Sequence, residues 1–319
     1  MSGGTGEPVI VAEGLAKWYS SEIPAVAELD LSVPTRSIFG FLGPNGAGKT
    51  TTISMLATLL QPTAGRAEVA GFDILRQPDD VRRSIGIMFQ ESTLDPDLSA
   101  EENLRFYGSL FGIGKRSSSR TISDLLELMD LQDRRKSPVR LFSGGMRRRL
   151  EIARSLLHAP KVLILDEPTT GLDPQTRILI WEQLQRFRAE YDLTVFMTTH
   201  HLDEAENCDL IAIMDHGDLI TQGTPAELKA VVGADLIRLR SADDPAAATA
   251  ISERFGLDVS IASDGLSFRV QDGAALVPRL CSAIGVPVMS VTVTPPTLDD
   301  AFLHYTGRTI REPRERAMS

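Results

Sequence analysis

The chain has 319 residues, enough for one large domain or two modest ones, and its 42% hydrophobic and 24% charged content is typical of globular proteins. A formal net charge of -10 disfavours a sequence-independent nucleic-acid binder, because such proteins need a basic surface. No apolar run approaches the roughly 20 residues that span a bilayer, so we expect a cytosolic chain that reaches a membrane only through a partner.

The two ends and the two cysteines predict little chemistry. Residues 1–8 are polar and Gly-rich, unlike a signal peptide, and we expect a flexible N-terminus there. A charged, flexible tail is expected over residues 309–319. Cys208 and Cys281 lie far apart without ligand-like neighbours, so we interpret them as incidental thiols in a reducing compartment.

A first domain, residues 9–232, is predicted to begin with a strand–loop–helix unit. Its predicted elements are strands at Val9–Ala12, Leu29–Val33 and Ser37–Leu42, and a helix at Lys49–Leu60. The Gly-rich residues 43–48 connect the third strand to the helix, which Pro62 and Gly65 end. Such a unit is the context that phosphate-binding loops require.

Residues 91–140 differ in texture and are predicted to form a helical insertion. Glu101–Phe111 and Thr121–Leu131 have amphipathic periodicity, and Gly112–Ser119 is predicted to be a loop. Two near-continuous apolar strands follow, Val162–Leu165 and Thr194–Thr198, which are typical of buried parallel sheets. Strands that alternate with helices predict an α/β fold, a mostly parallel sheet with helices on both faces.

Residues 233–308 are predicted to form a second, smaller domain. The predicted elements are strands at Asp235–Arg240, Val259–Ala262, Leu266–Val270 and Val286–Val293, and helices at Pro245–Phe255, Ala274–Ile284 and Leu298–Tyr305. In chain order, the six elements before the last helix follow the pattern βαββαβ, which predicts a ferredoxin-like domain. No catalytic cluster is evident there, so the domain is either a dimer-stabilising appendage or a regulatory ligand-binding domain; topology alone does not choose.

The Gly-rich loop carries the pattern Gly-x-x-x-x-Gly-Lys-Thr and is predicted to bind nucleotide phosphates. Its glycines let backbone N–H groups turn toward phosphate oxygens, at a helix N-terminus that favours anions. Lys49 supplies positive charge to the β- and γ-phosphates, and the Thr50 hydroxyl is available to Mg²⁺. The predicted phosphate-binding residues are Gly43, Pro44, Asn45, Gly46, Ala47, Gly48, Lys49, Thr50 and Thr51.

Two adjacent carboxylates end the strand Val162–Leu165. We predict that Asp166 holds Mg²⁺, directly or through water, and that Glu167, which points elsewhere, polarises an attacking water. The alternative is a polar strand end without chemistry.

A third motif, Ser143-Gly144-Gly145, lies between the phosphate loop and the acidic strand end. With the three motifs in this order, residues 9–223 resemble the ATP-binding subunits of ABC transporters. The resemblance implies an ATP- and Mg²⁺-dependent ATPase with a phosphate-loop cassette fold. It also implies that Tyr19 stacks on adenine, with Trp18 as the alternative.

The resemblance assigns roles to three further positions. Gln90 matches the glutamine that joins Mg²⁺ and the attacking water to the membrane partner, and Asp173 the aspartate that couples two ATP sites. His200 matches the histidine that contacts the γ-phosphate, with His201 as its solvent-facing neighbour. The catalytic residues so implied are Lys49, Gln90, Glu167 and His200, and the Mg²⁺ ligands are Thr50, Gln90 and Asp166.

In the family, the Ser-Gly-Gly motif closes the ATP of a second subunit, so the resemblance implies a head-to-tail dimer that shares two ATPs across Ser143, Gly144, Gly145 and Asp173. Phe142 and Met146 replace the usual Leu and Gln of this motif. The basic run Met146–Arg149 is interpreted as a charged helix face with salt bridges; direct phosphate contact is the alternative.

The variant motif Phe-Ser-Gly-Gly-Met-Arg-Arg-Arg and the C-terminal segment Pro296–Leu303 resemble the daunorubicin-resistance type of drug-efflux ATPase. That resemblance implies the export of a hydrophobic drug, antibiotic or lipid through separate membrane permease subunits, with no nucleic-acid partner. The chain is then expected at the cytoplasmic face of the cell membrane. The alternatives are an importer ATPase, a soluble ABC ATPase outside transport, or a non-hydrolysing ATP binder.

Overall fold

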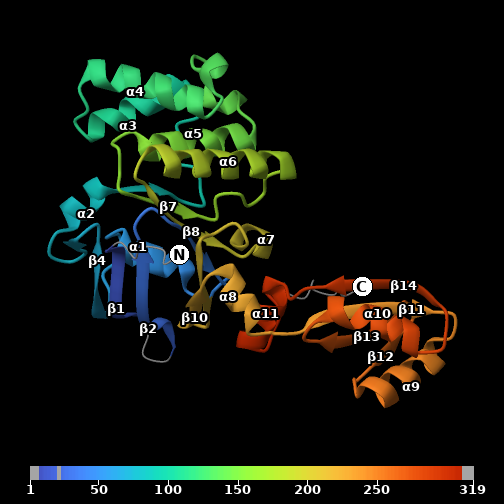
Figure 1. Cartoon of the computed structure of the whole chain (residues 1–319). Helices are drawn as coiled ribbons and strands as arrows, with labels where there is room; N and C mark the ends of the chain where they lie inside the picture. Colours follow the sequence, from blue (N-terminus) through green and yellow to red (C-terminus); the bar gives the residue numbers. More distant parts are fainter. Residues whose placement is uncertain (1–6, 20–22, 311–319) are drawn as a thin grey trace, which may run out of the picture. The chain divides into compact units, whose positions relative to one another are not determined.

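The computed structural model describes residues 7–19 and 23–310 (Figure 1). They divide into two compact units: the residues up to Thr224 together with Ile310, and Pro225–Thr309. The boundary predicted after residue 232 is therefore too late in the chain. Helix α8 (Pro225–Ala230) belongs to the second unit, because it packs against α11 (Leu298–Thr306). The termini predicted to be flexible lie mostly outside the described residues.

A six-stranded sheet forms the centre of the first unit. Its strand order is β10-β9-β3-β8-β7-β6, and every neighbouring pair is parallel except β9 with β10. The strands are β3 (Ile38–Leu42), β6 (Ile85–Met88), β7 (Val162–Asp166), β8 (Thr194–Thr199), β9 (Leu210–Asp215) and β10 (Asp218–Gly223). The predicted mostly parallel sheet is confirmed, and β3, β7 and β8 are buried along their whole length.

A second, antiparallel sheet has the order β2-β1-β4-β5. Its strands are β1 (Pro8–Trp18), β2 (Pro24–Pro34), β4 (Ala64–Val69) and β5 (Phe72–Asp73). Strands β1 and β2 are longer than predicted: beyond Ala12 their pairing continues to Trp18 through several register shifts. Leu15, Leu29 and other inward side chains share one apolar core with Ile53 of helix α1 (Lys49–Leu56) and Phe41 of the parallel sheet.

Helices α3 to α6 form the upper part of the first unit in the view of Figure 1. The first-unit helices after α1 are α2 (Pro78–Ser84), α3 (Ala100–Leu110), α4 (Lys115–Leu128), α5 (Gly144–Leu156), α6 (Pro174–Glu190) and α7 (Leu202–Ala205), with short 3₁₀ turns at Gln132–Arg134 and Val139–Leu141. Helix α3 begins with a capping box between Ser99 and Glu102.

The loop predicted at Gly112–Ser119 is wrong from residue 115 onward, where α4 already begins. The serine run has low helix propensity, but Ser118 is buried, and its hydroxyl lies near Gly108 of α3. Packing between α3 and α4 therefore overrides the local preference.

The second unit contains the predicted βαββαβ order. Its elements are β11 (Asp235–Ser241), α9 (Asp244–Phe255), β12 (Ser260–Ala262), β13 (Gly265–Val270), α10 (Gly273–Ala283) and β14 (Val288–Thr294), followed by α11. The antiparallel sheet has the order β12-β13-β11-β14. Ile237 and Leu266 on the sheet pack against Ile251 of α9 and Leu280 of α10 in a core of the unit's own.

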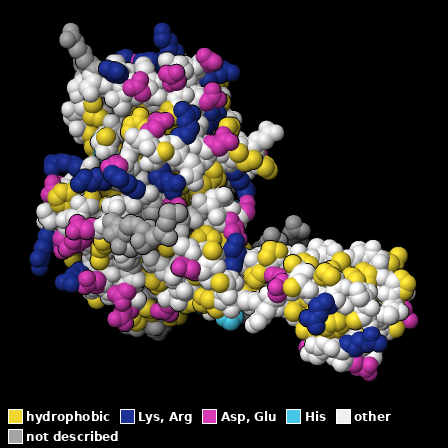
Figure 2. All heavy atoms as spheres, viewed as in Figure 1, with side chains coloured by type: hydrophobic (Ala, Val, Ile, Leu, Met, Phe, Trp, Pro, Cys, Tyr) yellow, Lys and Arg dark blue, Asp and Glu magenta, His cyan; other side chains and the backbone are white. Residues whose placement is uncertain are grey.

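None of the helices in the described part of the chain is long and apolar enough to cross a bilayer. In the face drawn in Figure 2, Lys and Arg side chains alternate with Asp and Glu side chains over the first unit.

Candidate nucleotide site

The phosphate loop connects the buried strand β3 to helix α1, as predicted. The Gly43 N–H donates to the Thr199 carbonyl at 3.3 Å, which ties the start of the loop to the end of β8. Gly48 is the N-cap of α1 and has φ 108°, a conformation that side chains disfavour. A Cβ there would also lie 2.4 Å from the Ala25 carbonyl oxygen, so this position requires glycine. No side chain caps α1, which leaves its first N–H groups available to an anion.

Lys49 is 5% exposed and folds back over the loop. Its Nζ donates to the carbonyl oxygens of Gly43 at 2.6 Å and Pro44 at 3.0 Å, and it lies 3.9 Å from Glu167 Oε1. Burial lowers the pKa of Lys49, while the charges of Glu167 and Asp166 oppose that shift. The Lys49 ammonium therefore lies between the loop and the acidic end of β7. A negatively charged phosphate bound there could take the place of the Gly43 and Pro44 carbonyls as its partner.

Asp166 lies at the end of β7 and is fixed by two hydroxyls. Thr50 donates to its Oδ2 at 3.1 Å, and Thr198 of β8 donates to its Oδ1 at 2.5 Å. A carboxylate and a hydroxyl beside a phosphate loop are the hard oxygen donors that Mg²⁺ prefers. Among the described residues no three His, Cys, Asp or Glu side chains form a metal cluster. The site therefore suits an ion that takes its remaining ligands from phosphate and water.

Glu167 follows Asp166 and has φ 48°, an unusual backbone conformation for a residue with a side chain. This turn sends the two adjacent side chains to different partners. Its Oε1 lies 3.0 Å from His200 Nδ1, and Thr170 donates to its Oε2 at 3.1 Å. The hydrogen bond with His200 lowers the pKa of Glu167, and the positive charge of Lys49 adds to that effect against the cost of burial. The carboxylate is thus ionised and able to accept a proton.

The structure distinguishes the two adjacent histidines. His200 contacts Glu167, whereas the His201 ring lies on the His200 ring, with centroids 4.1 Å apart. His201 also occupies the N-cap position of α7 without a side-chain cap. His200 is therefore the histidine that adjoins the carboxylate beside the phosphate loop.

The remaining predicted residues lie on exposed segments. Gln90 follows β6 with its side chain exposed, and Thr51 lies half-buried in the first turn of α1. Trp18 ends β1 and is 40% exposed, whereas Tyr19 is 68% exposed, so both rings are accessible to a base. Lys17 Nζ lies 5.7 Å from the centre of the Tyr19 ring.

Ser143 and Asp173 are both exposed helix N-caps. Ser143 accepts a hydrogen bond from the Met146 N–H at the start of α5, and Asp173 accepts from the N–H and hydroxyl of Thr176 at the start of α6. The bonds from Thr176 lower the pKa of Asp173. Gly144 is exposed as well, and an added Cβ would meet nothing closer than Leu172 at 3.8 Å. Ser143 and Gly144 are therefore accessible at the start of α5, whereas Gly145 packs against Thr176.

Two residues that position the site were missed from the sequence. Thr198 contacts both Asp166 and Glu167, since its hydroxyl donates to the former and accepts the N–H of the latter at 3.0 Å. Arg148, taken as part of a charged helix face, is instead buried beneath the site. Only the parallel pairing of β7 with β8 could have indicated Thr198, because it places Thr198 opposite Asp166.

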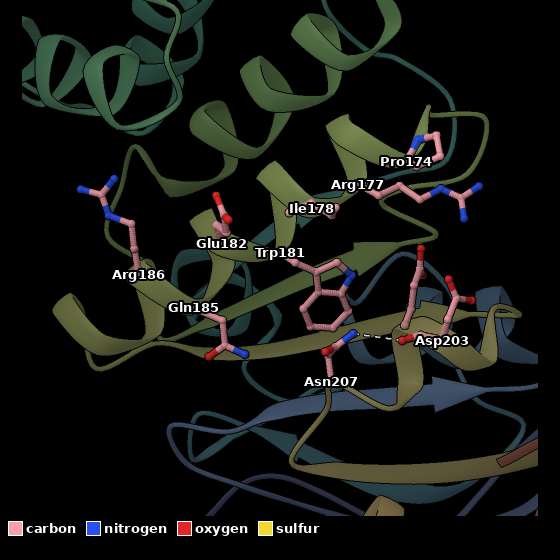
Figure 3. A pocket seen from close by; sticks show the side chains of 10 residues that line it. Pro174, Arg177, Ile178, Trp181, Glu182, Gln185, Arg186, Asp203 and Asn207 are labelled. Atoms are coloured by element: carbon pink, nitrogen blue, oxygen red, sulfur yellow. Dashed lines mark hydrogen bonds between the residues drawn. The ribbon is translucent and has the colours of Figure 1, made fainter. Parts of the chain in front are cut away.

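A separate hollow of about 840 Å³ lies between α6 and α7 (Figure 3). It contains none of the residues predicted to bind nucleotide; Trp181 lines it, and the Asn207 side chain donates to the Asp203 carbonyl at its floor. Its wall includes Glu204, which accepts hydrogen bonds from the hydroxyls of Thr169 and Thr199. Through Glu204 the hollow adjoins Thr199, the residue before His200, but it is separate from the phosphate loop.

A Gly-rich loop at a helix N-terminus, a lysine above it and two carboxylates at the neighbouring strand end define a phosphate-loop nucleoside triphosphatase. The family model described as "ABC transporter" matches residues 26–170. The chain is 42% identical to "Daunorubicin resistance ATP-binding protein DrrA3" of Streptomyces coeruleorubidus, over 94% of this chain and 96% of the relative. It is 39% identical to "Nod factor export ATP-binding protein I" of Ralstonia nicotianae, over 96% of each chain.

Solved structures agree with this assignment. The structure of cbiO1 from Clostridium perfringens, described as part of the ABC transporter complex cbiONQ, superposes with a TM-score of 0.66 and 28% identity over 71% of this chain and 93% of that one. The chain belongs to the ABC transporter family and is an ATP-binding subunit that hydrolyses ATP.

Proposed function

We propose that this chain powers the export of a hydrophobic drug, antibiotic or lipid through a separate membrane permease. The observation that supports export most directly is the match along nearly the whole chain, second unit included, to relatives named for drug resistance and for Nod factor export. The chain then works at the cytoplasmic face of the membrane, where ATP is available, attached through its permease.

In the proposed site each residue acts on ATP through contacts that the fold has prepared. Lys49 exchanges its carbonyl partners for the β- and γ-phosphates, and the free N–H groups of α1 hold the phosphate oxygens. Thr50 and Asp166, with Gln90, hold Mg²⁺, which when bound neutralises charge on the phosphates. Catalysis then rests on position and electrostatics.

Glu167 is proposed as the base that orients the attacking water and takes its proton. A glutamate is ionised at neutral pH, and the hydrogen bond with His200 lowers the pKa of Glu167 further, so the carboxylate is in the form that can accept a proton. His200 Nδ1 lies 3.0 Å from the Glu167 carboxylate. The same imidazole ring is proposed to contact the γ-phosphate through its other nitrogen. Tyr19, the more exposed of the two aromatic candidates, is proposed to stack on adenine.

We further propose that two copies close head to tail around two ATPs. Support comes from Ser143 and Gly144, which are exposed at a helix N-terminus on α5 and suited to an anion outside their own chain. Asp173, exposed at the start of α6, is proposed to reach across the same interface. Closure on ATP and reopening after hydrolysis would drive the permease.

The permease is proposed to dock beside Gln90. A hollow of about 390 Å³ there is lined by Phe89 and, on α3, by Phe106 and Leu110, which are 62% and 66% exposed. Exposed apolar side chains in a concave site are typical of protein docking surfaces. The hollow adjoins the segment that carries Gln90, so a docked helix would bear on the catalytic site.

Glu167→Gln tests both the catalytic assignment and the direction of transport. The variant, made with the permease, is expected to bind ATP, lose turnover and remain a closed dimer in gel filtration, whereas the exposed Glu182→Gln control stays native. Native turnover in Glu167→Gln would contradict the assigned base.

The small molecules of cells and medium are then compared between native and Glu167→Gln strains. Export predicts at least one hydrophobic compound that leaves the cells only when Glu167 is intact. Identical media, or a compound that enters cells only with intact Glu167, would contradict export.

A further inference from the structure

The three arginines that follow the Ser-Gly-Gly turn have different surroundings, although they are consecutive on α5. Arg147 is exposed. Arg149 points to the helical part of the unit, where its Nη1 donates to the Met129 carbonyl at 2.7 Å. Arg148 is 8% exposed and turned toward the parallel sheet. The basic run is therefore not one charged face, and Arg148 needs an explanation of its own.

The Arg148 guanidinium joins two segments that are far apart in sequence. On one side its Nε donates to the Pro168 carbonyl at 2.8 Å and its Nη2 to the Glu167 carbonyl at 2.5 Å. On the other side its Nη1 donates to the carbonyls of Phe89 at 3.0 Å and Gln90 at 3.2 Å. The planar fork of an arginine is suited to such simultaneous contacts.

Burial of this cation is compensated locally. Glu151, one turn further along α5 and 2% exposed, places its Oε2 at 3.5 Å from Arg148 Nη1. The other oxygen of Glu151 accepts the Thr93 N–H at 3.2 Å, in the segment that follows Gln90. Arg148 and Glu151 together therefore fix the Gln90 segment against α5 and β7.

The backbone of Glu167 depends on such fixing. A residue with a side chain at φ 48° is strained and persists only where its surroundings hold it. The Glu167 N–H donates to the Thr198 hydroxyl, and the Glu167 carbonyl accepts from Arg148. The peptide groups on both sides of Glu167 are therefore fixed by hydrogen bonds.

We propose that Arg148 is a positioning residue that fixes Glu167 and the Gln90 segment relative to each other, so that the two move as one. This inference rests on the proposed roles of Glu167 and Gln90 in hydrolysis. Arg148 lies on the same helix as Ser143, the N-cap of α5.

The test compares Arg148→Gln and Arg148→Lys with the exposed control Arg147→Gln. Arg148→Gln is expected to lower kcat at least about ten-fold while KM for ATP changes less than about three-fold, since position in the transition state is lost but the phosphate loop is intact. Arg148→Lys retains the charge beside Glu151 and so folds even if the Gln variant does not. Its single ammonium cannot span both segments, so kcat should fall at least about five-fold. Arg147→Gln should be native.

Amide hydrogen exchange gives a second readout that a general loss of stability would not mimic. In the Arg148 variants, exchange should rise in residues 89–93 and 167–170 and stay native in the phosphate loop and in the second unit. Native kcat in a folded Arg148 variant, or faster exchange spread evenly over the first unit, would overturn the proposal. If Glu167→Gln loses turnover while the Arg148 variants are native, only this inference fails; if Glu167→Gln itself has native turnover, the proposed role of Glu167 fails first.

Discussion

Thr198→Val is the perturbation that most sharply tests how the carboxylates are held. Thr198 is fully buried, and valine has nearly its shape, so the change removes one hydroxyl and little else. That hydroxyl donates to Asp166 Oδ1 at 2.5 Å and accepts the Glu167 N–H at 3.0 Å. The variant leaves a buried carboxylate oxygen and a buried N–H without these partners.

The magnitude follows from those two groups. A buried polar group that loses its hydrogen bond costs about 1–3 kcal/mol, and a charged group more, so the free energy of unfolding should fall by about 2–5 kcal/mol. At about 2–4 °C per kcal/mol for a unit of this size, Tm should fall by about 10 °C. Freed from Thr198, Glu167 can relax from φ 48°, and kcat should fall on the order of ten-fold or more.

The matched control is Thr52→Val in helix α1. Thr52 is also fully buried, but its hydroxyl only donates to the Gly48 carbonyl at 3.1 Å, which already accepts the Thr52 N–H at 2.9 Å. No group is left without a partner, so the control should stay within about 1 kcal/mol of native. Urea unfolding and steady-state ATPase assays measure both variants. Equal stability and equal kcat for Thr198→Val and Thr52→Val would refute the reasoning.

Two further predictions concern the helical part of the first unit and the cysteines. Glu101, 12% exposed, accepts two hydrogen bonds from Arg135 that hold its pKa below the ordinary 4.5, so this pair stabilises the fold above pH 4.5 and the effect is lost as pH falls through the lowered pKa. Glu101→Gln should therefore lower stability by about 1–2 kcal/mol at pH 7 and much less near pH 3, measured by urea unfolding; the same loss at both pH values would count against the pair. Burial raises the pKa of Cys208 while Cys281 is exposed, so a thiol reagent should label one cysteine in the native chain and two in denaturant, with Cys281→Ser removing the native reaction; rapid labelling of Cys208 in that variant would show that the core opens.

Much of the fold could be predicted because its signals are local. The apolar runs at β7 and β8, and the Gly-rich turn between β3 and α1, each specify their element without help from distant residues. The strand order is not local information: β3 lies between β8 and β9, which come far later in the chain. The start of α4 was misplaced because the burial of Ser118 against α3 outweighs serine's own preference.

The same distinction applies to the site. Lys49, Asp166 and Glu167 are predictable, because their chemistry depends on motifs of adjacent residues. The role of Arg148 is not predictable, because the sequence does not distinguish it from its neighbours Arg147 and Arg149. Its role becomes visible only in the folded chain, where α5 packs against β6 and the Arg148 guanidinium reaches the carbonyls of Glu167 and Gln90.

Activity of mixed dimers tests most directly whether each ATP is held by two chains. Lys49→Ala and Ser143→Ala subunits carrying different affinity tags are purified as mixed dimers and compared with each parent. A shared site predicts that the mixture regains ATPase activity well above both parents, because one of its two sites combines a native Lys49 with a native Ser143. Activity no greater than the mean of the two parent dimers would contradict the account.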